Sequence, residues 1–319
     1  MIAHVLAADL PGLLRQADLV GLATATIVAA TPLTLAALGG VMSERSGVVN
    51  IALEGIMLTT AFVGYAAALV THNLAAGLLA AIVSGMLIAG LHAVLSIEFL
   101  VDQIVSGTVI NILALGITGV FYRTFLQEQN VRGPGTLPLW KLPLLGDIPI
   151  LGRVLFSHQA VTYAMLVLVV VVHLIVFNTV WGLRTRACGE HPMAADTAGI
   201  NVKMVRYVNV LASGALGGLG GAYFSIQQIG NFLPNITGGR GFVALAAMIF
   251  GKWTPVGAFL ASLLFACADA LGARLQTYGV RIPPQFLSML PYILTIVVVA
   301  GAMGRAIAPA AVGRPYRKS

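Results

Sequence analysis

The sequence of 319 residues has very few charged side chains. Asp, Glu, Lys and Arg together make up 9% of the residues, whereas hydrophobic residues make up 58%. Ordinary soluble domains carry about 25% charged residues. So little charge excludes a typical soluble domain, and the apolar residues stand in long blocks. The sequence therefore predicts an integral membrane protein.

Cysteine and metal-site patterns are also missing. The two cysteines, Cys188 and Cys267, are too few for a disulfide framework and are interpreted as unpaired thiols. The six histidines never recur at the i, i+4 spacing of a helical metal site, so no metal is expected. The phosphate-binding Gly-x-x-x-x-Gly-Lys-Ser/Thr loop fails, because Trp253 follows Gly251-Lys252. The chain is therefore not expected to hydrolyse ATP by such a loop.

The net charge of +7 does not point to nucleic acid, because Lys and Arg at membrane flanks explain it. The start of the sequence has no basic region followed by a small-residue cleavage site, so no removable signal peptide is expected. The distribution of Lys and Arg favours a cytoplasmic location for the loop 183–206 and for the C-terminal tail. The Pro- and Gly-rich connection 123–158 is expected to be an ordered external loop.

Nine hydrophobic segments follow one another along the chain, and about twenty apolar residues in a helix cross the hydrocarbon layer. They are 19–41, 51–71, 74–97, 103–122, 160–178, 207–227, 241–251, 256–273 and 285–304. Segment 241–251 is too short to span and is expected to be a half-helix inside the bundle. The predicted fold is all-α, a polytopic transmembrane bundle of about eight to ten helices. It divides into an N-terminal segment 1–18, a membrane domain 19–304 and a tail 305–319.

Glycines gather in residues 213–222, which read SGALGGLGGA. A dinucleotide-binding loop would need a strand before the glycines and a helix after them, and the apolar surroundings do not predict a strand. The pairs Gly214/Gly218 and Gly217/Gly221 are spaced to share a helix face. Pairs of small residues at this spacing let membrane helices approach closely, so these four glycines are predicted to pack helices.

Polar side chains within the apolar segments are candidates for function, because they are costly in lipid. Asn50, Glu54, Asn111 and Gln227 are predicted to line a translocation pathway for a small, polar, uncharged solute, since amides both donate and accept hydrogen bonds. The alternative for each amide is a bond between helices. For Glu54, bracing and pathway lining are equally supported, with Arg45 or a neighbouring helix N-terminus as its partner. Asp102 stands at a helix entrance.

A polar segment, RTRACGEHPMAADTAGINVKMVR (184–206), stands between two apolar ones. Pro192 suits the first turn of a short helix, Glu190 lies near the N-terminus of that helix, and Gly199 suits its end. Ala194 and Ala195 would give the helix a slim face. The segment therefore predicts a docking loop that carries a short helix.

Five stretches together resemble a known family. SERSGVVNIALEGIML, LRTRACGEHPMAADTAGINV, SGALGGLGGAY, GGRGFVALAAMIFGKWTP and MLPYILTI follow in this order between about residues 32 and 304. They resemble the membrane permease subunit of ABC importers of the branched-chain amino acid and simple sugar group. Within that group the sequence is most similar to nucleoside-uptake permeases that work with a basic-membrane-protein type binding lipoprotein.

This resemblance implies partners and a location. Two permease subunits would form the pathway, the second being a related but different chain, and a separate ABC ATPase would bind ATP and Mg, with no cofactor on this chain. An external lipoprotein would deliver the solute, in the cytoplasmic (inner) membrane of a bacterium. The docking loop would carry the coupling helix that contacts the ATPase, through Arg186, Gly189, Glu190, His191, Pro192, Ala194, Ala195 and Gly199. His191 departs from the family pattern, which has Asn there.

Three other functions stay open. The cargo could be a simple sugar or a branched-chain amino acid, because the stretches are shared more widely than the substrate. An ion-coupled secondary transporter would need an essential carboxylate within the membrane and no docking loop. A membrane enzyme would need a convergent nucleophile and base, which the sequence does not reveal.

Overall fold

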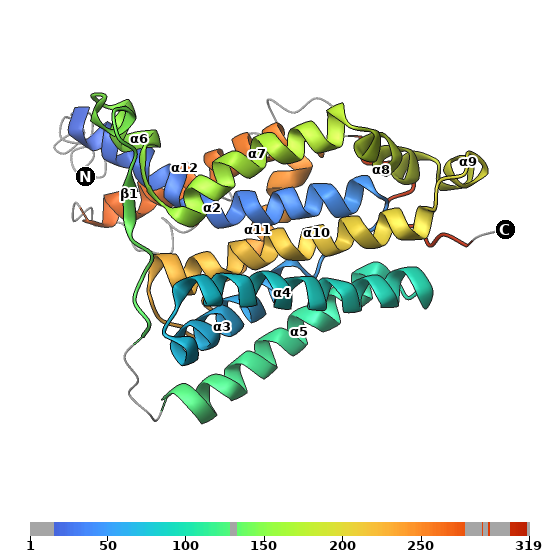
Figure 1. The fold of residues 1–319 in the computed structure, drawn as a ribbon, viewed down its shortest axis with the longest axis horizontal. Helices are drawn as coiled ribbons and strands as arrows, with labels where there is room; N and C mark the ends of the chain where they lie inside the picture. The colour runs from blue at the N-terminus through green and yellow to red at the C-terminus, as the bar shows by residue number, and fades with distance from the viewer. Residues whose placement is uncertain (1–15, 128–132, 278–288, 290–292, 294–306, 318–319) are drawn as a thin grey trace.

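The computed structural model describes residues 16–127, 133–277, 289, 293 and 307–317 (Figure 1). This part of the chain is mostly helical, and its strands are β1 (Leu139–Lys141) and β2 (Ser157–Gln159), which pair antiparallel. Six of its helices are long and apolar enough to cross a membrane. They are α2 (Gln16–Arg45), α3 (Leu53–Thr71), α4 (Leu74–Ala93) with the π-helical η1 (Val94–Glu98), α5 (Gln103–Tyr122) with η2 (Arg123–Gln127), α7 (Ala160–Asn178) and α12 (Pro255–Thr277).

The remaining helices connect or pack between these six. They are the short η3 (Leu145–Asp147) and α6 (Leu151–Leu155), then α8 (Val180–Glu190), α9 (Pro192–Thr197), α10 (Val202–Ala222) with the π-helical η4 (Tyr223–Gln228), and α11 (Arg240–Phe250). Segments 103–122 and 160–178 were predicted with the bounds that α5 and α7 have. Most of segment 285–304 lies outside the described residues. The predicted boundary between the membrane domain 19–304 and the tail 305–319 also lies outside them.

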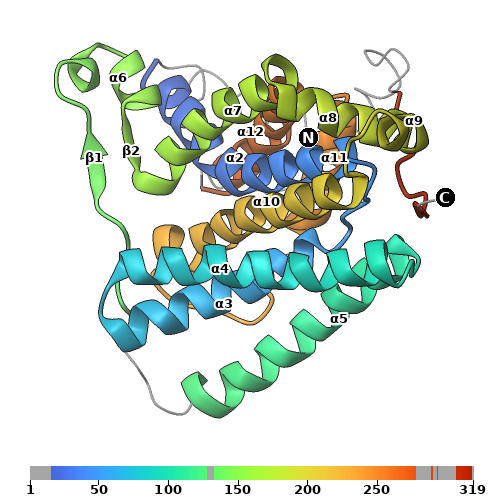
Figure 2. The same cartoon turned by 45° about the vertical axis from the view of Figure 1, so that its right-hand side comes forward.

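The helix α10 is central, because it packs against α4 and α3 on one side and α2 on the other (Figures 1 and 2). Its length would allow it to span, but α10 is not among the six apolar helices, and five glycines replace larger apolar side chains in it. A Cβ on Gly214 would lie 2.3 Å from the Gly85 carbonyl oxygen, and one on Gly218 2.5 Å from that of Ala81. On the α3 side, a Cβ on Gly221 would lie 2.2 Å from the Met57 oxygen, and one on Gly217 3.1 Å from Ile56.

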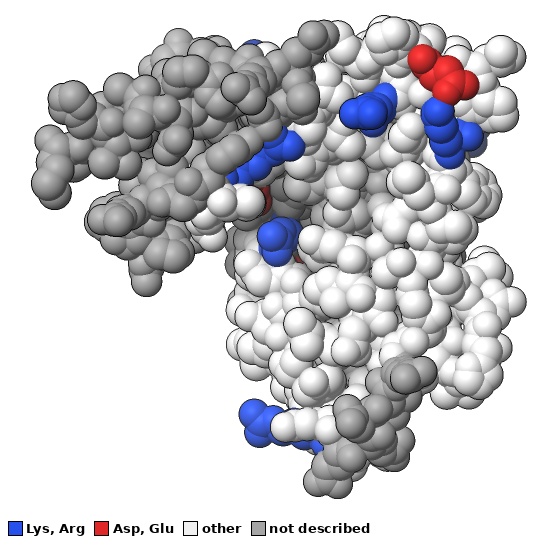
Figure 3. All heavy atoms as spheres, turned by 90° about the vertical axis from the view of Figure 1, so that its left-hand side faces the viewer, with Lys and Arg blue, Asp and Glu red and all other residues white. Residues whose placement is uncertain are grey.

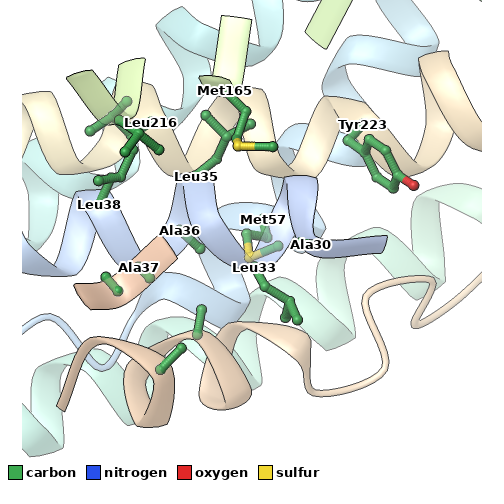
Figure 4. Packing of buried hydrophobic residues seen from close by; sticks show 14 of the residues in the cluster. Ala30, Leu33, Leu35, Ala36, Ala37, Leu38, Met57, Met165, Leu216 and Tyr223 are labelled. Atoms are coloured by element: carbon green, nitrogen blue, oxygen red, sulfur yellow. The ribbon is translucent and has the colours of Figure 1, made fainter. Parts of the chain in front are cut away.

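The main core lies where α2 crosses its neighbours. Leu35 and Leu38 of α2 are completely buried and belong to one cluster with Met165 of α7 and Leu216 of α10 (Figure 4). Burying each such side chain contributes roughly 1.5–3 kcal/mol in water, whereas between membrane helices close contact replaces the hydrophobic effect as the main source of stability. This cluster therefore joins α2, α7 and α10.

The two ends of the bundle differ. One end carries β1, β2 and α6, and the other carries α8, α9 and residues 307–317 (Figure 1). Figure 3 looks at the first end, where a few Lys and Arg and still fewer Asp and Glu interrupt a mostly uncharged described surface. At this end, Lys141 of β1 forms an ion pair with Asp147 of η3.

Several helices begin at a side-chain cap, which satisfies backbone N–H groups that have no partner within the helix. Asp102 accepts from the N–H groups of Ile104 and Val105 at the start of α5, which confirms its predicted place at a helix entrance. Asn73 caps α4 in the same way, and Thr179 and Asn201 each accept one N–H at the starts of α8 and α10.

Candidate functional site

The segment that connects α2 to α3 is not helical, although most of its residues are buried. Residues 46–52 (SGVVNIA) run from the end of α2 into the bundle. Such backbone survives inside a membrane protein only where its polar groups find partners in the protein. Here neighbouring helices supply them. Gln103 accepts from the Val49 N–H at 2.7 Å, and the His92 ring lies 2.8 Å from the Val49 oxygen.

Asn111 of α5 completes this support and fixes the start of α3. Its Oδ1 accepts from the Gly55 N–H at 2.7 Å, and its Nδ2 donates to the Ile51 oxygen at 2.9 Å. Gly55 allows the close approach, because a Cβ there would lie 3.0 Å from backbone atoms of α5. Asn111 therefore binds α5 to the first turn of α3.

Glu54 stands in the same first turn of α3 and binds the start of α11. Its Oε1 accepts from Thr237 Oγ1 at 2.6 Å and from the Gly239 N–H at 2.9 Å, while its Oε2 accepts from the Gly241 N–H at 2.6 Å. A carboxylate at a helix N-terminus is favoured by the free N–H groups and by the helix dipole. Of the two predicted partners, the neighbouring helix N-terminus is the one that the structure shows. Arg45 instead donates to the Trp253 oxygen.

Glu54 and Asn111 also line a hollow of about 390 Å³ between α3, α5 and the start of α11. Its other lining residues are Leu58, Thr108, Ile112, Leu115, Asn235, Gly239 and Phe242. Pockets for small molecules usually measure about 300–1,000 Å³ and combine apolar walls with a few polar groups. This hollow has both properties. Lys and Arg are absent from its lining among the described residues.

Aromatic rings border the hollow one or two turns further along α3 and α5. Phe232 is completely buried and lies edge-on to Phe62 of α3, with ring centroids 5.2 Å apart. The ring centroid of Tyr122 in α5 lies 5.9 Å from that of Phe232. Leu58 belongs both to this cluster and to the lining of the hollow. The cluster therefore lies next to the hollow and shares Leu58 with it.

The other two predicted pathway residues lie elsewhere. Asn50 is fully buried and donates to Ser213 of α10 at 2.9 Å. Gln227 accepts from the Val161 N–H at the start of α7 and donates to Thr162 Oγ1 at 2.8 Å. Neither lines the hollow. The structure therefore brings two of the four predicted residues together at a hollow. Each of the four also forms hydrogen bonds that join its own segment to another segment of the chain.

The docking loop contains the short helix that its sequence predicts. Pro192 occupies the first turn of α9, and Gly199 follows its end with φ +82°, a backbone conformation that glycine adopts easily. Ala194 is exposed and Ala195 is buried, so the alanine pair has one side chain on each face. His191 precedes the helix but makes no side-chain cap. The face that could receive another protein contains Met193, Ala194 and Thr197.

The base of α9 is tied to the rest of the bundle. A Cβ on Gly189 would lie 2.2 Å from the Arg45 oxygen, so the end of α8 touches the end of α2 backbone to backbone. The Ala311 N–H donates to the Gly189 oxygen at 2.8 Å, and the Ala310 N–H donates to Glu190 at 3.1 Å. Arg186 is directed back toward the bundle, with its guanidinium 5.3 Å from the Phe177 ring. Residues 307–317 therefore bind the base of the docking loop, and we call this segment the clasp.

Burial beneath this clasp also makes Cys188 inert. Its side chain is fully buried with Ala195, Val202 and Tyr316, and this raises the pKa of the thiol to about 11. Thiolate is the reactive form of cysteine, so Cys188 has the properties of a structural residue. The sequence had left Cys188 without a role, and its place in the loop gave no signal of burial.

A further contact, which the sequence does not predict, joins α2 to the turn between α11 and α12. Trp253 Nε1 donates to Glu44 at 2.6 Å, while the backbone oxygen of Trp253 accepts from Arg45 at 2.8 Å. Lys252 and Trp253 both have left-handed backbone conformations, with φ of 54° and 52°. The stretch GKWTP is a signal for this turn, because Gly251 and Pro255 stand on either side of only three residues.

Comparison with known proteins agrees with this architecture. Residues 22–299 match the profile of the branched-chain amino acid transport system permease component family. The guanosine ABC transporter permease protein NupQ of Bacillus subtilis is 45% identical over 92% of this chain and 95% of its own length. The nucleoside ABC transporter permease protein NupC of Lactococcus lactis is 41% identical over the same shares, and the putative glucose ABC transporter permease protein TsgC13 of Haloferax volcanii is 34% identical over 89% and 92%.

No solved structure matches the chain. The family match covers most of the sequence, including every element of the site except the clasp. The six apolar helices fit a multi-pass membrane protein, and subunits of this family transport solutes rather than catalyse a reaction. The chain belongs to the branched-chain amino acid transport system permease family.

Proposed function

We propose that this chain is the permease subunit of an ATP-driven ABC importer whose cargo is a nucleoside. The assignment of a nucleoside as cargo rests on the similarity, over nine tenths of the chain, to relatives named for guanosine and nucleosides. A hollow with apolar walls, a few polar groups and no Lys or Arg among its described lining residues supports it, because nucleosides carry a flat ring and uncharged polar groups. A sugar is the second candidate, since the Haloferax relative is named for glucose.

The cargo is tested by uptake. Cells that lack nucleoside uptake receive this permease with its partner subunits, and radiolabelled guanosine and glucose are offered separately. Guanosine uptake that disappears when this chain alone is omitted supports the proposal. Uptake of glucose but not guanosine would instead assign a sugar.

In this proposal α9 is the coupling helix, and Asn50, Glu54, Asn111 and Gln227 belong to the pathway or hold its walls. ATP and Mg bind to a separate ATPase and not to this chain. The contacts between residues 307–317 and the docking loop support one side for both, and we assign that side to the cytoplasm. The end that carries β1 and β2 then faces outward, toward an external binding lipoprotein.

The coupling role is tested best at Ala194. Its side chain is exposed on α9, so Ala194→Trp leaves the clasp intact, whereas a change at Glu190 would also remove the bond to Ala310. We expect the variant to insert normally, to lose binding of the ATPase and to lose uptake. Ala75→Trp is the matched control, because Ala75 is exposed in the first turn of α4 at the opposite end. Equal ATPase binding by both variants would refute the assignment of α9.

The partners are tested by a pull-down. The tagged chain is extracted from its native membrane in mild detergent, and retained proteins are identified by mass spectrometry. We expect an ABC ATPase, a second, related permease and a binding lipoprotein. Recovery of the chain alone, under conditions that preserve a known ABC complex, would contradict the proposed assembly and favour a secondary transporter.

A further inference from the structure

The hollow between α3, α5 and α11 has a composition that lipid does not explain. Glu54, Thr108, Asn111 and Asn235 contribute to its lining beside four apolar side chains. Polar and ionisable side chains exposed to hydrocarbon are costly, so a hollow with this lining is expected to hold water, a polar solute or another protein surface. Its volume of about 390 Å³ lies in the range of small-molecule sites.

The carboxylate in the hollow still has room for one donor. Two carboxylate oxygens offer about four lone-pair positions. Three of them are used by Thr237, Gly239 and Gly241. Because these donors hold both oxygens in place, the remaining position on Oε2 is oriented in advance, which lowers the cost of binding a hydroxyl or N–H group.

An aromatic ring stands beside this acceptor. Phe242 lies in the first turn of α11, lines the hollow and is 48% exposed. Arg240, two residues earlier, is directed elsewhere, since its guanidinium lies 5.6 Å from the Phe224 ring. The first turn of α11 therefore contributes an apolar ring to the hollow and keeps its cation away. A solute with a flat ring and hydroxyl groups fits this combination, whereas a phosphate would meet the Glu54 carboxylate without a compensating cation.

From this arrangement we infer that the hollow is a nucleoside subsite, in which Phe242 stacks on the base while Glu54 and Asn235 bind sugar hydroxyls. This rests on the proposed function and adds to it the residues that select the cargo. Base–aromatic stacking tolerates different bases, so Phe242 would accept purines and pyrimidines alike. Glu54 would select against nucleotides.

Uptake kinetics of the assembled transporter test the subsite. In Phe242→Leu, the KM for guanosine should rise roughly tenfold or more, the order expected for the loss of one base–aromatic stack. Phe242→Tyr keeps an aromatic ring and should raise the KM less than Phe242→Leu does. Phe99→Leu is the matched control, because Phe99 is exposed but does not line the hollow. Binding of guanosine to the isolated lipoprotein should be the same for all, since the lipoprotein is unchanged.

A second measurement does not depend on turnover. Thr108→Cys, which lines the hollow but is not one of the three residues assigned to bind the nucleoside, is placed in a chain whose Cys188 and Cys267 are replaced by alanine. The assembled transporter in nanodiscs is then labelled with a maleimide. Guanosine should slow labelling in the presence of the lipoprotein and ATPase, and guanosine monophosphate should not.

The outcomes separate the two proposals. If wild-type transporter takes up guanosine while Phe242→Leu equals Phe99→Leu and guanosine gives no protection, the subsite is refuted and the proposed function stands. If wild type with all partners takes up no nucleoside, both proposals are refuted.

Discussion

Glu54 serves two helices with one carboxylate. Replacing it by glutamine keeps its shape but places an amide NH2 group opposite N–H or O–H donors of Thr237, Gly239 or Gly241. A buried donor that loses its acceptor costs about 1–3 kcal/mol. We therefore expect Glu54→Gln to lower the free energy of unfolding by about that amount and to reduce uptake, as measured by thermal unfolding of the detergent-purified protein and by guanosine transport.

The matched control for this change is Glu98→Gln. Glu98 forms an ion pair with Lys203 at 2.7 Å, and both side chains are more than 40% exposed. Exposed pairs contribute about 0–1 kcal/mol, so this variant should unfold almost as wild type does. If both variants shift the unfolding temperature equally, the capping role of Glu54 is refuted.

We expect the β1–β2 ribbon to be sensitive to acid through His158. Its Nε2 donates to the Val154 oxygen at 2.7 Å, and burial lowers the pKa of the ring. Because the pKa in the folded state lies below the ordinary value of about 6.5, the folded protein binds fewer protons near that pH than the unfolded protein does. The neutral ring therefore stabilises the ribbon above pH 6.5, and this stability is lost as the pH falls.

Hydrogen exchange at Leu139–Lys141 checks this sign. After correction for intrinsic rates, exchange should be faster at pH 5.5 than at pH 7.5 in wild type, whereas His158→Gln, which has no titrating ring, should show little change. His72→Gln is the control, because His72 lies exposed in the α3–α4 turn and its loss should leave the pH dependence intact. A pH dependence that persists in His158→Gln would assign it to another group.

Among the elements, the contact between α4 and α10 leaves no room for an added side chain at Gly218. A Cβ on Gly218 would lie 2.5 Å from the backbone oxygen of Ala81, and backbone cannot move aside as a flexible side chain can. We expect Gly218→Ala to destabilise the protein by about 1–3 kcal/mol, as overpacking usually does.

The control for this prediction is Gly116→Ala in α5. No atom lies within 4 Å of a Cβ at Gly116, and alanine favours the helix by about 0.5–1 kcal/mol over glycine. Thermal unfolding in detergent should therefore show a lower midpoint for Gly218→Ala and an equal or higher one for Gly116→Ala. The same shift in both would mean that helix propensity, not packing, determines the result.

The long helices could be predicted from sequence because their signal is local. An apolar run of about twenty residues gives α5 and α7 their bounds directly. The non-helical segment 46–52 could not be predicted, since its partners His92, Gln103 and Asn111 come from 40 or more residues later in the chain. The same holds for the candidate site. The sequence identified Glu54 and Asn111 as costly in lipid, but only the fold places Phe242 and Asn235 beside them.

At the scale of the whole molecule, one series of contacts joins the docking loop to the hollow. Gly189 touches Arg45, Arg45 and Glu44 bind Trp253 at the end of α11, and the start of α11 binds Glu54. Trp253→Phe keeps a ring there but leaves the buried Glu44 carboxylate without its indole donor, at a cost of about 1–3 kcal/mol. We expect guanosine uptake to fall while the ATPase still binds.

Uptake and ATPase binding are measured in parallel with those of Trp140→Phe. Trp140 is 58% exposed on β1 at the opposite end, so this control should change neither quantity. If Trp253→Phe transports guanosine as wild type does, the contacts through α11 do not couple the docking loop to the hollow.

The packing around α10 also constrains how the protein is made. Asn50 and Ser213, which bond in the finished bundle, lie 163 residues apart in the sequence. At a synthesis rate of about 5–20 residues per second, the first half of the chain waits on the order of ten seconds or more for α10 to leave the ribosome. During that time the faces of α3 and α4 that α10 will cover, with Asn50 beside them, are open to lipid or to the insertion machinery. Newly made chains should therefore be most exposed to membrane proteases before residue 213 emerges.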